Sequence, residues 1–316
     1  SCYPDGDAKE CPDNVPIGCW DTSKVTDMTY AFFGKASFDD SINCWDVKKV
    51  TSMNGIFKLA ADFNQPLDDW NVANVNTMNK MFQGATNFNQ PLDYWNMANV
   101  TDVYWMFQGA TDFNQPLDDW NVASVTNMGN MFRDATNFNQ PLDYWNTASV
   151  SYMSGMFNSA SDFNQPLNNW NVASVTNMYG MFNSATDFNQ PLNDWDVASV
   201  SKMDSMFMQA TAFNQPLSDW NVASVTFMER MFQEAFIFNQ PLNDWNMAFV
   251  NTMINMFGGA TKFNQCLSTW ADKSPPNLFV NGIFGDSGCP DNANPNPLVG
   301  PWCQGEDEQC IAPSES

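Results

Sequence analysis

Carboxylate side chains recur in this sequence at a spacing of 25 residues or a multiple of it, and this regularity would allow them to act together as ligands. Five aspartates each stand directly before a recurring tryptophan: Asp69, Asp119, Asp194, Asp219 and Asp244. If the chain coils once every 25 residues, these side chains form a column in which neighbouring carboxylates repel by roughly 1 kcal/mol at about 4 Å in water. Ca²⁺ takes carboxylate and amide oxygens, so the column predicts a possible calcium site, although no D-x-D-x-D-G loop is present. The alternative is that the aspartates are simply solvated.

Two tyrosines interrupt the acidic column and suggest a second chemistry. Tyr94 and Tyr144 occupy the same position as the aspartates, and Asn96 and Asn146 follow two residues later. Aromatic rings that stack on sugars, beside amides that bond hydroxyl groups, predict a glycan-binding surface. Separately, Asn99-Val100-Thr101 is an N-glycosylation sequence, so Asn99 is a predicted modification site.

The cysteines lie only towards the two ends of the chain. They are Cys2, Cys11, Cys19, Cys44, Cys266, Cys289, Cys303 and Cys310. An even number clustered in this way predicts disulfide-bonded caps and a secreted or cell-surface protein. Cys19 and Cys44 each precede a repeat tryptophan, and stacked strands lie about 4.8 Å apart, so we expect these two to pair and Cys2 to pair with Cys11. The four C-terminal cysteines allow three connectivities. Zinc is disfavoured because the chain has no histidine and no C-x-x-C pair.

A strict repeat must position all these residues. Tryptophan recurs every 25 residues at Trp20, Trp45, Trp70, Trp95, Trp120, Trp145, Trp170, Trp195, Trp220, Trp245 and Trp270. Such a period is the signature of a solenoid, in which each rung buries its apolar face against its neighbours. We expect an irregular cap at 1–18, one solenoid over 19–270, and a cap rich in proline and cysteine at 271–316.

The pattern within a rung predicts one strand and one short helix. In residues 163–187, Leu167, Trp170 and Val172 have the spacing of inward strand positions. The predicted helix has Ser174 as its N-cap and Val175, Met178, Met181 and Phe182 along one side. We therefore predict an α/β solenoid: a leucine-rich-repeat-like, right-handed stack of about ten strand–helix rungs. The repeated asparagine that includes Asn64 and Asn164 is expected to satisfy backbone groups of adjacent rungs.

The repeated pattern W-x-V-x-x-V-x-x-M-x-x-M-F-x-x-A-x-x-F-N-x-x-L resembles the BspA-like leucine-rich repeats of microbial surface proteins. The resemblance covers about 250 of the 316 residues. It implies an extracellular or cell-surface location and a role in adhesion or matrix building rather than catalysis.

Composition narrows the range of partners. The chain has a net charge of −23 and a pI near 4.1, which disfavours nucleic acid and favours cations or cationic partners. No apolar run is long enough to span a membrane. Residue 1 does not begin a signal peptide, so we expect a mature form.

Several positions that are polar in most rungs become apolar near the C-terminal end. These are Met208, Phe227, Phe236, Ile237, Phe249 and Ile254. We predict that they form an interface covered either by the C-terminal cap, the favoured alternative, or by another protein. Tyr104 and Trp105 form a second, smaller candidate.

These observations favour an extracellular structural or adhesive repeat protein that makes protein–protein contacts. A self-assembling subunit of a filament or surface layer is one form of this function. The near-identical rungs favour mechanical stacking. The alternative is a recognition module that binds Ca²⁺ or glycans through its acidic side. An enzyme is disfavoured because the sequence has no histidine, no phosphate-binding loop and no distinctive carboxylate pair.

Overall fold

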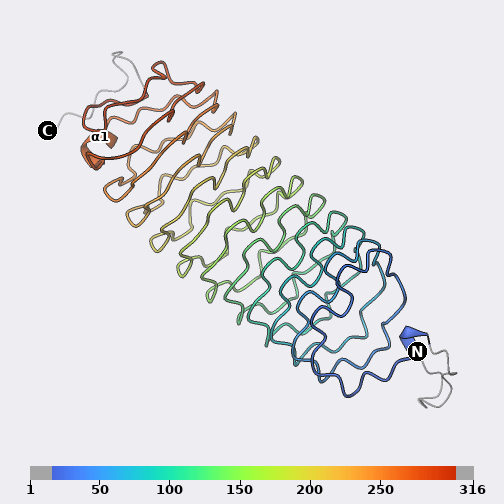
Figure 1. The fold of residues 1–316 in the computed structure, drawn as a ribbon. Helices are drawn as coiled ribbons and strands as arrows, with labels where there is room; N and C mark the ends of the chain where they lie inside the picture. Colours follow the sequence, from blue (N-terminus) through green and yellow to red (C-terminus); the bar gives the residue numbers. More distant parts are fainter. Residues whose placement is uncertain (1–15, 304–316) are drawn as a thin grey trace.

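The chain forms an elongated stack of similar coils. The structure is a computed structural model, and it describes residues 16–303. Successive coils follow one another along a single axis, so that the first and last described residues lie at opposite ends (Figure 1). The predicted solenoid with a 25-residue period is therefore confirmed.

A column of parallel backbone bridges sets the register of the stack. Ten bridges connect equivalent residues of successive coils: Asp27, Ser52, Thr77, Asp102, Asn127, Tyr152, Asn177, Lys202, Phe227, Thr252 and Phe279. Among residues 16–303 the only helices are the 3₁₀-helix η2 (Ile17–Cys19) and the α-helix α1 (Trp270–Lys273). Both lie at the ends of the stack, so the predicted rung of one strand and one helix is wrong in its elements.

The two predicted elements also exchange roles. The segment predicted as a strand closes into a turn, in which the Trp170 N–H donates to the Leu167 carbonyl at 3.1 Å. The segment predicted as a helix contains the bridge residue Asn177. Its backbone N–H groups alternate: Met178 and Phe182 donate to the next rung at 3.0 and 2.9 Å, whereas Met181 donates back to Met178 at 3.2 Å.

Left-handed residues explain why this segment does not continue as a helix. Gly180 and Ser184 both have a φ of 57°, and the equivalent residues of the other rungs also have positive φ. An L residue pays roughly 1–2 kcal/mol for this conformation, and two such residues in every turn are incompatible with an α-helix. The periodicity of the methionines therefore reports a tight coil rather than a helix.

The core consists of the recurring, mostly apolar side chains. Leu167, Trp170, Val172, Met178 and Phe182 are almost completely buried, as are their equivalents in the central rungs. The inward positions and the core role of the methionines are therefore confirmed. Each indole also bonds across rungs: the Trp170 Nε1 donates to the Leu142 carbonyl at 2.8 Å.

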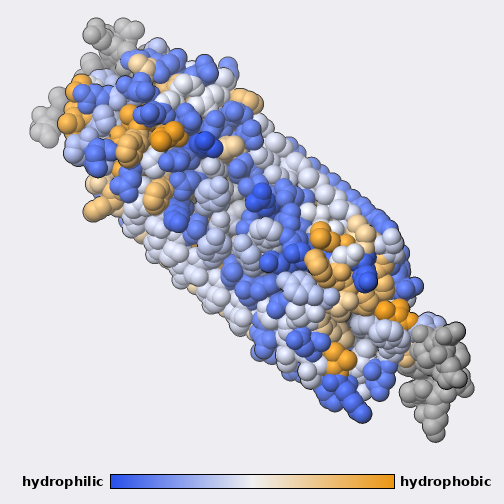
Figure 2. Space-filling model, in the orientation of Figure 1, coloured by the Kyte–Doolittle hydropathy of each residue, from blue (hydrophilic) through white to orange (hydrophobic). Residues whose placement is uncertain are grey.

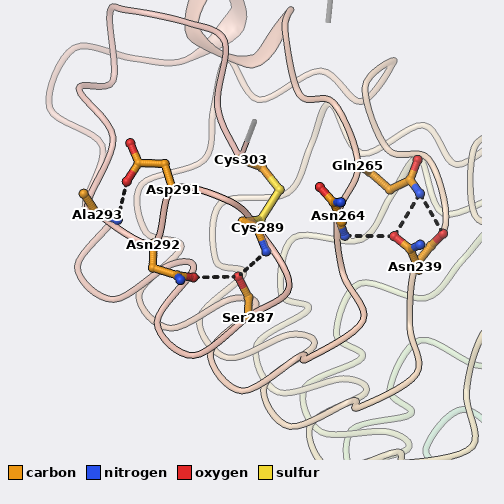
Figure 3. Close-up of a disulfide and its surroundings, with 9 residues drawn as sticks. All are labelled: Asn239, Asn264, Gln265, Ser287, Cys289, Asp291, Asn292, Ala293 and Cys303. Atoms are coloured by element: carbon orange, nitrogen blue, oxygen red, sulfur yellow. Dashed lines mark hydrogen bonds between the residues drawn. A yellow bond between two sulfur atoms is a disulfide. The ribbon is translucent and has the colours of Figure 1, made fainter. Parts of the chain in front are cut away.

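The repeated asparagine connects the rungs as predicted. The Asn164 Oδ1 accepts a hydrogen bond from the Asn189 N–H at 3.0 Å and another from the Gln190 Nε2 at 2.9 Å. The same arrangement closes the last regular rung, where Asn239 accepts from Asn264 and Gln265 (Figure 3). These amides are consumed by the fold, which leaves their columns little capacity to bind a ligand.

The coil continues beyond the predicted boundary at residue 270. The Met253 N–H donates to the Phe279 carbonyl and the Phe257 N–H donates to the Ile283 carbonyl, both at 2.8 Å. The Phe284 ring stacks on Phe257 with centroids 5.8 Å apart. Residues 278–286 therefore add one further layer to this side of the stack, beyond the boundary that the sequence predicts.

Disulfides are present near both ends of the described chain, but one predicted pair is not formed. Cys289 and Cys303 are bonded, with Cα atoms 4.8 Å apart (Figure 3), and Cys44 and Cys266 are also disulfide-bonded. The predicted pairing of Cys19 with Cys44 is wrong. Side chains at the same position of successive rungs run parallel, whereas a disulfide requires the two side chains to converge. Cys2, Cys11 and Cys310 lie outside the described residues.

Candidate interaction face

Differences between rungs are concentrated in one segment of the coil. In the rung that contains Met78, the side chains of Met78, Met81 and Phe82 are buried, and equivalent residues fill the core of the central rungs. The residues between and beside them change from rung to rung. They occupy the positions of Thr77, Asn79, Lys80, Gln83 and Gly84, and we call these positions, in all the rungs, the variable face.

The variety on this face is large. At the position of Asn79 the successive rungs carry Thr29, Asn54, Asn79, Tyr104, Gly129, Ser154, Tyr179, Asp204, Glu229 and Ile254. By contrast, the Asn-Gln-Pro-Leu segment of the same rungs is almost constant. Because the bridges align equivalent residues, these differing side chains form neighbouring columns on one side of the stack.

The variable face also carries the positive charge of the central rungs. Between residues 50 and 261 the cationic residues are Lys58, Lys80, Arg133, Lys202 and Arg230, and all five belong to this face. Three lysines on this face lie against aromatic rings of adjacent rungs: Lys58 over Phe33 at 5.4 Å, Lys80 over Trp105 at 5.9 Å and Lys202 over Phe227 at 6.0 Å. Cation–π contacts of this kind contribute about 0.5–1 kcal/mol at exposed sites.

Polar side chains on this face are held by chains of hydrogen bonds across rungs. The Gln83 Nε2 donates to the Gln108 Oε1 at 2.8 Å, and the Gln108 Nε2 donates to the Asp134 Oδ2 at 2.9 Å. Asp134 also pairs with the Arg133 guanidinium at 3.4 Å. Side chains fixed in advance lose less entropy on binding, which favours recognition.

Strain and unpaired polar atoms are found on the same face. Lys80 and Trp105 stand at left-handed positions, with φ of 60°, where three other rungs have Gly55, Gly155 and Gly180. Four buried side-chain polar atoms have no partner among residues 16–303, and three of them belong to this face: Asn79 Oδ1, Gln83 Oε1 and Trp105 Nε1. Such features are costly and gather at functional sites in proteins.

The variable face was not recognised in the sequence as a site. The signal was present, because the residues between the two methionine positions differ from rung to rung, whereas those two positions carry methionine in most rungs. On the predicted helix these positions would also lie on one outer side, opposite the methionines, and only Tyr104, Trp105, Met208, Phe227 and Ile254 among them were singled out.

The acidic column lies elsewhere in the rung, in the turn before the tryptophan. Its five aspartates are exposed. Asp69 accepts a hydrogen bond from the Asn43 amide at 3.1 Å, and Asp219 accepts one from the Asn193 amide. In the described part of the chain, no three Asp, Glu, Cys or His side chains converge into a group that could hold a metal ion. Calcium binding to this column thus remains a prediction that would require amide or carbonyl ligands.

The predicted glycan residues are accessible but separated. Tyr94 and Tyr144 are 78% and 83% exposed and stand two rungs apart. The Oδ1 atoms of Asn96 and Asn146 accept the N–H of Ala98 and of Ala148, so these oxygens already stabilise a local turn. The arrangement neither confirms nor excludes a glycan site.

The predicted glycosylation site is exposed and bonded to its neighbour. The Asn99 Nδ2, the atom that would carry a sugar, donates to the Ala73 carbonyl of the preceding rung at 2.7 Å. This nitrogen carries two hydrogens, and a glycan would replace one of them. Modification of Asn99 stays a prediction.

The predicted apolar interface divides into two groups. Met208, Phe227 and Ile254 belong to the variable face, whereas Phe236, Ile237 and Phe249 do not. Met208 and Ile254 are half-buried, and the other four are exposed by 38–66%. Residues 271–303 leave these four exposed, so the described part of the cap does not cover them as expected. Apolar surface gathers towards both ends of the molecule on the side shown in Figure 2.

Within residues 16–303, no helix has the length and apolar character needed to cross a membrane.

Comparisons with known proteins identify a family and show distant structural likenesses. No curated protein matches the chain. An internalin from Listeria monocytogenes is 9% identical with a TM-score of 0.21, over 71% of this chain and 74% of the internalin. TLR13, solved as a complex described as TLR13-ssRNA13, is 11% identical with a TM-score of 0.28, over 75% of this chain and 38% of TLR13. A family described as Mycoplasma protein of unknown function, DUF285, matches three overlapping segments at residues 7–115, 91–190 and 167–270. Since these segments together cover most of the sequence, the chain belongs to the DUF285 family.

Proposed function

We propose that this protein is an extracellular recognition module that binds another protein through its variable face. The observation that carries the proposal is the concentration of rung-to-rung differences on one side of an otherwise regular stack. A purely mechanical solenoid needs only the constant interior and the rung-to-rung hydrogen bonds. Side chains that differ between rungs supply the irregular chemistry that recognition of a specific partner requires.

The composition of the face supports a protein partner. Tyrosine, tryptophan and arginine supply most of the binding energy in protein interfaces, and the face carries Tyr104, Trp105, Arg133, Tyr179 and Arg230. Ten rungs spaced by about 4.8 Å give a length on the order of 45 Å. That length is sufficient for a standard interface, which buries about 800 Å² on each partner.

The disulfides support an extracellular location. Cys44, Cys266, Cys289 and Cys303 are all disulfide-bonded, and such bonds persist in oxidising compartments. Detection of the protein in the medium or on the surface of intact source cells, with its disulfides oxidised, would support this location. Confinement to the reducing cytosol would contradict it.

Site-specific photo-crosslinking tests the proposed face. A photoreactive phenylalanine analogue replaces either Tyr104 or Tyr179 on the variable face, and Tyr94 or Tyr144 on the acidic column as the matched control. The labelled proteins are incubated with intact source cells, and crosslinked partners are identified by mass spectrometry. We expect the same partner protein from both variable-face positions and not from the controls. Crosslinks that arise only from Tyr94 and Tyr144 would overturn the assignment.

A second set of variants tests whether the face supplies the affinity. Tyr104→Ser, Trp105→Asn, Tyr152→Asn and Tyr179→Ser each introduce the residue that another rung carries at the same position, so the fold should be retained. The combined variant should lose partner binding. The control Tyr94→Asp with Tyr144→Asp, designed by the same principle, should bind normally.

Self-association is a second candidate function, favoured by apolar side chains exposed near both ends. Phe33 and Leu59 are exposed near the first coils, and Phe236 and Phe249 near the last. Contacts between opposite ends would produce a filament. Sedimentation velocity over a hundredfold range of concentration tests this, and a monomer throughout that range would exclude it.

Calcium or glycan recognition by the acidic column is the remaining alternative. It is supported by the exposure of the five aspartates and of Tyr94 and Tyr144. A melting temperature unchanged by chelation, together with a glycan array that stays blank in millimolar calcium, would dispose of it.

A further inference from the structure

A hollow on the variable face lies within the rungs that surround Asp204. It has a volume of about 210 Å³ and is lined by Tyr152, Ser154, Asn177, Tyr179, Lys202, Asp204 and Phe227. A water molecule occupies about 30 Å³ of liquid, so the hollow has room for roughly seven waters. It is therefore large enough to admit the end of a long side chain.

The wall of the hollow contains a carboxylate that forms no ion pair within the described residues. Asp204 is partly buried, and among residues 16–303 the ion pairs are Lys48–Asp46 and Arg133–Asp134, neither of which involves it. Desolvation raises the pKa of Asp204, and the nearby Glu229 carboxylate raises it further, whereas backbone hydrogen bonds and the Lys202 ammonium oppose the shift. A cation at this place would compensate the charge.

Aromatic rings flank the carboxylate. Tyr179 precedes Asp204 by one rung in the same column and is 50% exposed, and Phe227 lies one rung beyond Lys202 in the neighbouring column. Lys202 extends over the Phe227 ring at 6.0 Å, so the protein itself already places an ammonium group on one ring of this hollow. The Tyr179 ring offers a second π-surface beside Asp204.

We infer that the hollow binds a basic side chain, lysine or arginine, of a partner protein. Asp204 would accept hydrogen bonds from the entering cation, and Tyr179 would provide a ring for it to stack on. Arginine fits both features best, because its planar guanidinium stacks on aromatic faces and bonds carboxylates in a bidentate manner. This inference rests on the proposed function and specifies the chemistry of its partner.

An anion, a metal ion or a neutral sugar would fit the charged residues of the hollow less well than a basic side chain. Asp204 and Glu229 outnumber Lys202 here, which disfavours an anion. In the described residues no group of three acidic, cysteine or histidine ligands exists, which disfavours a metal ion. A neutral sugar would leave the Asp204 charge uncompensated. The chain as a whole has a net charge of −23, which attracts basic partners to it.

Calorimetric titration of the full chain with tri-arginine and tri-lysine peptides, blocked at both ends, tests the inference at 150 mM NaCl. The variants are Asp204→Asn and Tyr179→Ser, and both introduce residues that other rungs carry at that position. The matched control is Asp119→Asn, which removes the same charge from the exposed acidic column. Asn169 shows that the column accepts asparagine.

We expect both peptides to bind the wild-type chain, and tri-arginine to bind more tightly than tri-lysine. Asp204→Asn should weaken tri-arginine binding by about tenfold, in keeping with hydrogen bonds to charged groups. Tyr179→Ser should weaken it severalfold, and Asp119→Asn should leave it unchanged.

Three results would overturn the inference. Equal losses for Asp204→Asn and Asp119→Asn would show general attraction of basic peptides to an acidic protein. Absence of peptide binding would show that the hollow does not bind basic side chains. Preferential binding of a neutral trisaccharide would show that it is a sugar site. The proposed function can survive each of these results, because protein crosslinks from Tyr104 do not depend on this hollow.

Discussion

The indole Nε1 of Trp170 donates a hydrogen bond of 2.8 Å to the carbonyl oxygen of Leu142, one rung earlier. The Trp170 ring also lies 6.2 Å from Trp145 with an angle of 3° between the ring planes. One residue therefore fills the core, continues an aromatic column and satisfies a buried carbonyl. This combination explains why tryptophan marks the period of the sequence.

Trp170→Phe should keep much of the ring volume but leave the Leu142 carbonyl unpaired. A buried polar group without a partner costs about 1–3 kcal/mol, so we expect a clear fall in the urea midpoint, followed by circular dichroism. Trp20→Phe is the matched control, because Trp20 is 54% exposed. Equal effects at the two positions would show that the buried hydrogen bond is unimportant.

Asn164→Ala should destabilise the stack, because the Asn164 Oδ1 accepts hydrogen bonds from two residues of the next rung. We expect a loss of about 1–3 kcal/mol in the free energy of unfolding. Asn164→Asp should cost less, since Asp39 already occupies the equivalent position and accepts the Asn64 N–H at 2.8 Å. Chemical denaturation of the two variants compares them, and the reverse order of stability would contradict the ladder.

Gly180→Ala should strain the left-handed turn. Gly180 has a φ of 57°, and alanine at such a value costs roughly 1 kcal/mol. Gly180→Asn should cost less, because Asn130 and Asn255 occupy the equivalent position with φ of 53°. A Cβ atom added at Gly180 would make only ordinary van der Waals contacts. The loss of stability would therefore report the backbone conformation alone. Differential scanning calorimetry should give a higher melting temperature for Gly180→Asn than for Gly180→Ala.

Asp204 should reduce stability at neutral pH. Its pKa is raised in the folded chain, mainly by desolvation, so between the ordinary value of 3.8 and the raised value the folded state binds more protons than the unfolded state. Stability contributed by this residue therefore falls as the pH rises through that window. Asp204→Asn should raise the melting temperature at pH 7. It should also reduce the difference between the melting temperatures at pH 4 and pH 7. If Asp119→Asn changes this difference equally, the burial of Asp204 is not the cause.

The disulfide Cys289–Cys303 should stabilise the C-terminal coil. It closes a loop with a sequence separation of 14, and loops of about 15 residues gain about 3 kcal/mol from such a bond. Cys289→Ser combined with Cys303→Ser should therefore increase amide hydrogen exchange over residues 278–303. Exchange in the rungs around Trp145 should stay unchanged, because coils contact only their neighbours. Uniformly faster exchange along the chain would contradict this local role.

The sequence alone determined the period, the interior and the class of architecture. The spacing of Trp170 and its equivalents, with Leu167 and Phe182, specifies a repeated apolar face, and a face repeated every 25 residues can be buried only by stacking. The asparagine ladder through Asn164 was predictable for the same reason, because a repeated amide in a turn must find its partner on the adjacent rung.

Tertiary structure decided the path of the chain between these fixed points. The methionine spacing suits a helix, but hydrogen bonds from Met178 and Phe182 to the next rung, with left-handed residues such as Gly180, produce a tight coil instead. That choice depends on a neighbouring rung, which local propensity does not contain. The period alone places Tyr179 and Asp204 in one column, whereas the path of the coil decides that they line one hollow with Lys202 and Phe227.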